Sequence, residues 1–384
     1  MTTLGRMRGE VRLSLAEKLW QINWSLALLV TLVAVIGFAM LYSAANGSWD
    51  PWAMRQLMRF GVGLLLMIGA ALVDIRYWMR LAYPIYFVAL ALLGAVDWVG
   101  ADAMGAQRWL DLKVIQLQPS EIMKVALVLA LARYFHGVGP EQIGRITTVF
   151  VPLLLVLAPV LLVLKQPDLG TAIVLLASGG ALFFLAGVRL WKFAALLAAA
   201  VAAVPLGWHF LHGYQRARIL TFLDPERDPL GTGYHILQSK IALGSGGILG
   251  KGFLEGTQSH LNFLPVKATD FVFTMLAEEF GIIGGLALLS LYVLVIIYGT
   301  AVALNARNQF GRLVAMGVTV TFFLYVFINI AMVMGLIPVV GVPLPLVSYG
   351  GTALLSILFA LGLVLSVNVH RDVRIGRRGV EGGI

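Results

Sequence analysis

The chain has 384 residues, of which 60% are hydrophobic and 12% are charged, and its formal net charge is +9. Soluble domains have about 25% charged residues, so the composition excludes a single soluble core and indicates a protein that crosses a membrane several times. Cysteine is absent, which excludes disulfides, iron–sulfur clusters and a thiolate nucleophile. Basic loops beside anionic lipid explain the positive charge, so we expect no nucleic-acid partner.

Ten apolar segments follow one another along the chain, each close to the roughly 20 residues that a helix needs to cross the hydrocarbon layer. They lie near residues 24–45, 53–74, 79–98, 120–136, 147–164, 169–187, 190–211, 271–300, 312–334 and 351–369. We therefore predict an all-α polytopic membrane protein with about ten transmembrane helices, organised as a single integral membrane domain over residues 1–384.

Basic residues distinguish the two sides of the predicted bundle. They are concentrated in the tails 1–23 and 370–384 and in the short turns that an even number of spans places on the same side. The positive-inside rule makes this side cytoplasmic, with both termini there. The other side carries two long connections, about 99–119 and 212–270, and loops of that length usually carry function.

The stretch QPSEIMK opens the fourth span, and its Glu121 and Lys124 share one helix face. Two interpretations stay open: an ion pair that anchors the span, and a functional pair at membrane depth. In QPDLGT, Asp168 stands at the start of the sixth span, and aspartate is a favoured N-cap residue there.

Glycine-rich GSGGILGKG (244–252) resembles a P-loop, which requires Gly, four residues and then Gly-Lys-Ser/Thr. Ser245 stands where the first glycine is needed and Gly252 follows the lysine, so nucleotide binding is rejected. A closely packed glycine loop is the simpler interpretation, and a backbone that approaches a phosphate or sugar is the alternative.

Three features of the outer side raise the question of a binding site. Arg216, Arg218 and Lys240 lie in the longest loop, where they suit either a pyrophosphate or a solvated basic loop. The stretch PLPLVSYGGT (343–352) predicts non-helical backbone before the last span, which indicates a cavity there or a kinked helix entry. Asp270 immediately precedes the eighth span, and this position favours a role as the N-cap of that helix.

Longer stretches resemble the SEDS family (shape, elongation, division and sporulation proteins). They are RWLDLKVIQLQPSEIMK (108–124), QPDLGTA (166–172), GSGGILGKG (244–252), GTQSHLNFLPVKATDFVFTMLAEEFGIIGG (256–285) and GLIPVVGVPLPLVSYGGTALLS (335–356). The similarity covers essentially the whole chain. The residues GTQS and the sequence of the proline-rich stretch are more similar to the elongation branch of the family than to its division branch.

The resemblance implies a peptidoglycan glycosyltransferase of the bacterial cytoplasmic (inner) membrane. Such an enzyme polymerises lipid II (undecaprenyl-pyrophosphoryl disaccharide-peptide) within the elongation machinery that maintains cell shape, beside a class B penicillin-binding protein that crosslinks the strands. The aspartate, glutamate and lysine of the family's motifs map to Asp270, Glu121 and Lys124. This chain has Val266 and Ala268 where the family commonly has Glu and His.

On this basis we expect an inverting displacement on the outer face, with Asp270 as the general base and undecaprenyl pyrophosphate as the leaving group. Loop cations, or a bound Mg²⁺ or Mn²⁺, are expected to neutralise the negative charge on that leaving group. The residues expected to bind substrate or pyrophosphate, or to support the site, are Glu121, Lys124, Arg108, Arg216, Arg218, Lys240, Lys267, Asp168, Glu279 and Ser348. A lipid II flippase is the alternative, because ionisable residues at membrane depth also suit transport.

Overall fold

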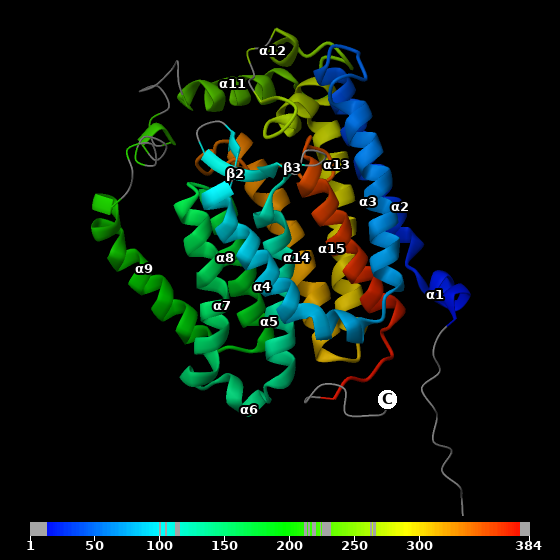
Figure 1. Ribbon diagram of the computed structural model, residues 1–384. Coiled ribbons are helices and arrows are strands. Elements are labelled where there is room, and N and C mark those ends of the chain that lie inside the picture. Colours follow the sequence, from blue (N-terminus) through cyan, green and yellow to red (C-terminus); the bar gives the residue numbers. More distant parts are fainter. Residues whose placement is uncertain are drawn as a thin grey trace, which may run out of the picture.

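The computed structural model describes residues 14–99, 101–103, 106–111, 116–210, 213, 216, 220–222, 224, 232–261, 263 and 266–376, whose long helices form a bundle (Figure 1). Within these residues, ten helices have 18 or more residues. They are α2 (Trp24–Ala44), α3 (Ala53–Leu72), α4 (Ile75–Val99), α5 (Pro119–Gly137), α7 (Ile146–Lys165), α8 (Leu169–Ala186), α9 (Leu190–Phe210), α13 (Val272–Asn305), α14 (Gln309–Val333) and α15 (Gly351–Val369). These ranges follow the ten predicted segments closely, which confirms the all-α polytopic fold.

Eight of the ten helices are long enough and apolar enough to cross a membrane. In α9 the described residues contribute a shorter apolar stretch, Leu190–Ala199. Helix α5 contains Glu121, Lys124 and Arg133, which lower its hydropathy. Most of its side chains are buried, so protein rather than lipid surrounds the first two of these charges.

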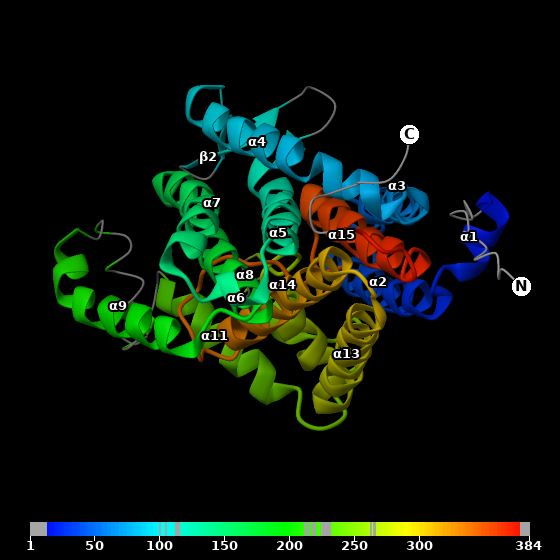
Figure 2. The same ribbon diagram turned by 90° about the horizontal axis from the view of Figure 1, so that it is seen from below.

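Helices α5 and α14 lie in the interior of the bundle, and α4, α7, α8, α13 and α15 pack against one or both of them (Figures 1 and 2). Helix α3 packs along α15, α4 packs along α5, and α13 packs along α14. In both views α9 lies at the margin of the bundle, and its side chains Leu190, Trp191, Leu196, Leu197 and Val201 are exposed. Such an apolar exposed surface suits contact with lipid.

The bundle has two ends, which we name by the elements that they carry (Figure 1). The loop end carries the strands β1 (Ala101–Ala103), β2 (Ala106–Asp111) and β3 (Gln116–Leu117) and the helices α11 (Thr232–Ser245) and α12 (Thr257–His260). The three strands form one antiparallel sheet in the order β1-β2-β3. The termini end carries α1 (Leu15–Gln21), α6 (Pro140–Ile143) and the end of α15. The two connections predicted as long loops therefore contain regular structure.

Helix α1 lies in the segment that was predicted only as a tail. Ser14 caps it, accepting from the backbone N–H of Glu17 while the Glu17 carboxylate accepts from the Ser14 N–H. This capping box stabilises a helix too short to show hydrophobic periodicity.

Helix α13 is interrupted at Gly281, whose φ of 65° and ψ of −162° are not helical. The loop 246–252 enters the break and supplies the hydrogen bonds that the helix loses there. The backbone bonds are Lys251 N to Glu278 O (3.1 Å), Gly252 N to Glu279 O (3.0 Å), Ile282 N to Gly247 O (3.0 Å) and Ile283 N to Ile248 O (3.3 Å). Non-helical backbone at membrane depth is tolerated where protein satisfies it in this way. The interpretation of GSGGILGKG as a closely packed loop is confirmed.

Gly250→Ala is expected to destabilise the protein by about 2–5 kcal/mol, because a side chain there is strained twice. Gly250 has a φ of +83°, and a Cβ atom would overlap the carbonyl oxygen of Glu279. The matched control is Gly247→Ala in the same loop, where φ is +55° but a Cβ atom meets nothing within 4 Å. Thermal unfolding in detergent should show a much larger loss for Gly250→Ala, and equal losses would contradict the packing argument.

Candidate active site

Asp270 lies at the loop end, in the turn that leads into α13. The turn is fixed to two other segments: Tyr349 N donates to Ala268 O (2.8 Å), and Asn329 Nδ2 donates to Asp270 O (2.9 Å). The side chain of Asp270 is half-buried, and its Oδ2 lies beside Gly341. The backbone of Asp270 is thus held in place while the residue stays partly exposed.

The prediction that Asp270 caps α13 is wrong. The helix begins at Val272 after Phe271, which forms no side-chain cap. Asp270 instead lies in the turn held by Tyr349 and Asn329, contacts between segments that sequence spacing does not reveal. Its carboxylate is therefore not committed to capping this helix.

The segment between α14 and α15 is irregular and largely buried, which confirms the predicted non-helical backbone. Ser348, predicted as a supporting residue, is buried, and its Oγ accepts from Leu344 N (2.8 Å) and donates to Thr269 O (2.5 Å). The side chain of Asn329 also donates to Val342 O (2.8 Å). The segment and the Asp270 turn therefore form one hydrogen-bonded unit, rather than a kinked helix entry.

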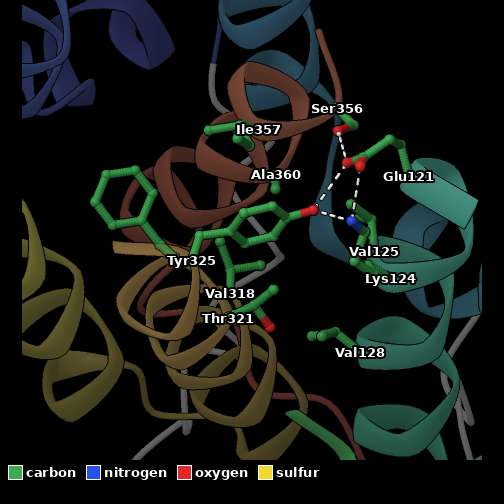
Figure 3. Close-up of a pocket in the computed structure, with 11 residues that line it drawn as sticks. Glu121, Lys124, Val125, Val128, Val318, Thr321, Tyr325, Ser356, Ile357 and Ala360 are labelled. Atoms are coloured by element: carbon green, nitrogen blue, oxygen red, sulfur yellow. Dashed lines mark hydrogen bonds and ion pairs between the residues drawn. The ribbon is translucent and has the colours of Figure 1, made fainter. Parts of the chain in front are cut away.

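Glu121 and Lys124 lie inside the bundle, where α5, α14 and α15 border a cavity (Figure 3). Lys124 Nζ is 2.7 Å from Glu121 Oε1 and also donates to the hydroxyl of Tyr325. The other carboxylate oxygen, Glu121 Oε2, accepts from Tyr325 OH (2.9 Å) and from Ser356 Oγ (3.2 Å). Both charged residues are only 4% exposed.

Polar and apolar side chains both line this cavity. Beyond the charged pair, its walls come from Val125, Val128, Val318, Phe322, Ile357 and Ala360. A buried ion pair with all its partners in place avoids the large cost of an uncompensated charge. The cavity is small, about 30 Å³, and combines a fixed polar cluster with apolar walls.

Asp168 and Arg108 join the sheet to the start of α8. Asp168 is confirmed as the N-cap: its Oδ1 accepts from Thr171 N (3.1 Å) and its Oδ2 from Thr171 Oγ1 (2.9 Å). The guanidinium of Arg108 donates to Gln166 O (3.1 Å) and Pro167 O (2.6 Å). Both side chains thus have structural contacts, and their predicted part in substrate binding stays a prediction.

Glu278 and Glu279 are buried on the first part of α13 and bind the segment around α12. Glu278 Oε1 accepts from Lys251 Nζ (2.8 Å) and from Gln258 N (2.9 Å). Glu279 Oε1 accepts from Ser43 Oγ and lies 3.3 Å from His260 Nε2. These contacts fix α12 against α2 and α13, close to the break at Gly281.

Lys267 is buried next to the Asp270 turn, and its Nζ donates to Ser259 O (2.8 Å). Burial lowers the pKa of Lys267 below its usual value. Because the folded state disfavours the charged form, protonated Lys267 opposes folding, and this opposition weakens as pH rises through the lowered pKa.

Of the remaining cations named from the sequence, Lys240 lies in α11. Lys240 is exposed, and its side chain lies against Gly335. Arg216 is half-buried, and Arg218 lies outside the described residues. In the part of the chain that the structure describes, no group of three or more His, Asp or Glu side chains could hold a metal ion.

Tyr325 and Asn329 were missed by the sequence analysis, although both lie in the centre of the site. Each is a polar residue in the middle of a long apolar span, and polar groups in such places need partners. Attention to uncharged polar residues within the ninth span would have found them. Their partners Glu121 and Asp270 are far away in sequence, so the contacts themselves come only from the fold.

Comparison with known proteins identifies the family and the fold. A model of the FtsW/RodA/SpoVE family of cell cycle proteins matches residues 18–373. The peptidoglycan glycosyltransferase MrdB of Escherichia coli strain K12 is 46% identical over 349 residues, which cover 90% of this chain and 93% of that protein. The probable peptidoglycan glycosyltransferase FtsW of Trichlorobacter lovleyi is 36% identical over 362 residues, covering 90% of this chain and 93% of the relative.

Two solved structures share the fold. Thermus thermophilus rod shape determining protein RodA superposes with a TM-score of 0.70 at 32% identity, over 92% of this chain and 98% of that one. A chain from a peptidoglycan synthase complex, studied for its coordination of polymerization and crosslinking, superposes with a TM-score of 0.80 at 36% identity. That match covers 91% of this chain and 98% of the other.

The helical bundle and the polar clusters near its loop end define a multi-pass membrane protein with a site at one end. The chain belongs to the FtsW/RodA/SpoVE family of cell cycle proteins, which is the SEDS family that its motifs resemble.

Proposed function

We propose that this chain is a peptidoglycan glycosyltransferase that polymerises lipid II during cell elongation, with Asp270 as the general base. Its relatives named as peptidoglycan glycosyltransferases support the reaction class. The identity of 46% to MrdB against 36% to the FtsW relative, and the fold shared with RodA, favour elongation over division. The observation that carries the site is the half-buried Asp270 carboxylate on a fixed turn.

The proposed reaction is a single inverting displacement. The hydroxyl oxygen of the acceptor sugar forms a bond to the anomeric carbon of the donor, and the bond from that carbon to the pyrophosphate oxygen breaks. The proton of the hydroxyl passes to the Asp270 carboxylate as the new bond forms, because a sugar hydroxyl is too weak an acid to ionise first. The fixed turn contributes by holding the base in position.

The charge that collects on undecaprenyl pyrophosphate requires cations. A Mg²⁺ or Mn²⁺ ion would neutralise part of it, and Mg²⁺ commonly binds through one or two carboxylates plus substrate phosphates. On this turn, Asp270 would supply the carboxylate that binds such an ion.

The loop end is proposed to face the outside of the cytoplasmic membrane, with both termini in the cytoplasm. Basic tails support this orientation. Because the chain lacks cysteine, single cysteines report it cleanly. Ser48→Cys, exposed at the loop end, should react with a membrane-impermeant maleimide in whole spheroplasts, whereas Asp372→Cys should react only after lysis. The opposite pattern would reject the orientation.

The function is tested with the purified chain and lipid II, with and without a class B penicillin-binding protein and a divalent cation. The solved relative from a peptidoglycan synthase complex supports including that partner. Glycan strands resolved on a gel are the expected product. Labelled lipid II that equilibrates across liposomes without forming polymer would identify a flippase instead.

A further inference from the structure

Two arginines of α3, Arg55 and Arg59, lie one helical turn apart near the loop end. Arg55 is exposed and Arg59 is half-buried, and no carboxylate pairs with either among the described residues. Arg59 is the seventh residue of α3, about 9 Å along the helix axis from its start. Like charges at this spacing repel each other, and an ionisable residue within a spanning helix usually marks a functional site.

The guanidinium of Arg59 lies between Tyr349 and the first turn of α15. Its Cζ atom is 5.1 Å from the centre of the Tyr349 ring. A Cβ atom added to Gly351 would lie 3.1 Å from the same Cζ, so glycine at this position leaves room for the guanidinium. The N-cap of α15 is Gly350, which has no side chain to satisfy the first N–H groups of the helix. Such a helix start attracts an anion.

Thr352 provides an independent indication of a ligand. It is the second residue of α15 and only 5% exposed, and its Oγ1 has no hydrogen-bond partner among the described residues. Because Cα–Cβ bonds in a helix tilt toward its N-terminus, this hydroxyl lies at the same end as the free N–H groups. A buried hydroxyl without a partner is costly, so native proteins usually satisfy it.

Short links join this arrangement to Asp270. Gln56, three residues before Arg59, donates from Nε2 to Ser348 O (2.9 Å). Ser348 Oγ donates to Thr269 O (2.5 Å), and Thr269 precedes Asp270. The helix that carries the arginines is thus linked by hydrogen bonds to the turn that holds the proposed base.

The buried cation Lys124 is already neutralised. Lys124 forms its ion pair with Glu121 at 2.7 Å and contacts Tyr325. Arg59 differs because its described surroundings are an aromatic ring, glycines and a helix start, which add no negative charge. A guanidinium in such surroundings is suited to binding phosphate oxygens.

We propose that Arg59, together with Arg55 and the first turn of α15, binds a lipid phosphate, namely the pyrophosphate of the polyprenyl-linked sugar substrate. The inference rests on the proposed function, because it names the part of that substrate held near Asp270. An anionic phospholipid headgroup offers similar chemistry, and the test separates the two.

The test compares Arg59→Gln and Thr352→Val with the control Arg307→Gln, an exposed arginine at the termini end. Binding of undecaprenyl pyrophosphate and of phosphatidylglycerol is measured in detergent, alongside thermal unfolding and the KM for lipid II. Arg59→Gln should weaken undecaprenyl pyrophosphate binding at least tenfold and raise KM, while phosphatidylglycerol binding stays the same. Thr352→Val should weaken the same binding severalfold while keeping or raising the unfolding temperature, because it removes a buried unpartnered hydroxyl.

Wild-type affinity for undecaprenyl pyrophosphate in Arg59→Gln would overturn the inference. An equal loss of both lipids would overturn it in favour of a headgroup site. If Arg59→Gln does not fold, Thr352→Val is the deciding variant. Its binding of undecaprenyl pyrophosphate is then compared with its binding of phosphatidylglycerol, and wild-type affinity for undecaprenyl pyrophosphate would overturn the inference. Binding that depends on Arg59 in a chain that makes no polymer with its partner would leave the site standing and reject the proposed function.

Discussion

Asp270→Asn is expected to lower the rate of glycan-strand synthesis by about two to four orders of magnitude, the usual contribution of a general base. Asparagine has nearly the same shape, so the hydrogen bond from Asn329 to the backbone carbonyl and the turn itself should persist. The amide cannot accept the proton of the acceptor hydroxyl. The measurement is the initial rate of polymer formation from lipid II by the purified variant with its transpeptidase partner.

Asp372→Asn is the matched control, since Asp372 is exposed at the termini end in an ion pair with Arg307. It should polymerise at the wild-type rate, and both variants should unfold at the wild-type temperature. A near wild-type rate in Asp270→Asn would reject the base assignment. An Asp270→Asn variant that has lost thermal stability would instead show that the carboxylate supports the fold.

Glu121→Ala is expected to cost about 3–5 kcal/mol of stability, because it leaves the ammonium of Lys124 buried without its counter-charge. The substitution also removes the acceptor for Tyr325 OH and Ser356 Oγ. Thermal unfolding in detergent should show a fall of many degrees, and polymer formation should fail. An unchanged unfolding temperature would mean that Lys124 finds water or lipid phosphate in the variant.

The double substitution Glu121→Leu with Lys124→Met separates the two interpretations that the sequence left open. Apolar replacements often restore the stability lost when one member of a buried pair is removed, so this variant should recover most of it. A pair that only anchors α5 would then leave polymer formation intact. We expect the stable double variant to make no polymer, because Tyr325 of the cluster lies one helical turn from Asn329, which holds the Asp270 turn.

The spans were predictable because a long apolar run in lipid has few structural choices, and a helix satisfies its backbone internally. Local signals also sufficed for Asp168, which caps α8. The ion pair of Glu121 and Lys124 followed from their spacing on one helix face. These features depend on residues a few positions apart, where sequence determines geometry directly.

Long-range packing decided the rest. Spacing indicated that Asp270 was a cap, but contacts from residues 59 and 79 positions away place it in a turn before the helix. The break in α13 at Gly281 depends on a loop that begins 35 residues earlier and replaces the lost hydrogen bonds. Tyr325 joins the ion pair from 201 residues beyond Lys124.

The sequence by itself thus determined the class of protein, its long helices, the cap of α8 and the family, because lipid and short-range geometry leave little freedom. Only the tertiary structure decided which polar groups meet: Asp270 with Asn329, Glu121 with Tyr325 and Ser356, and Arg59 with the start of α15. The physical reason is that buried polar atoms must find partners wherever the packed helices place them, and that placement is a property of the whole bundle.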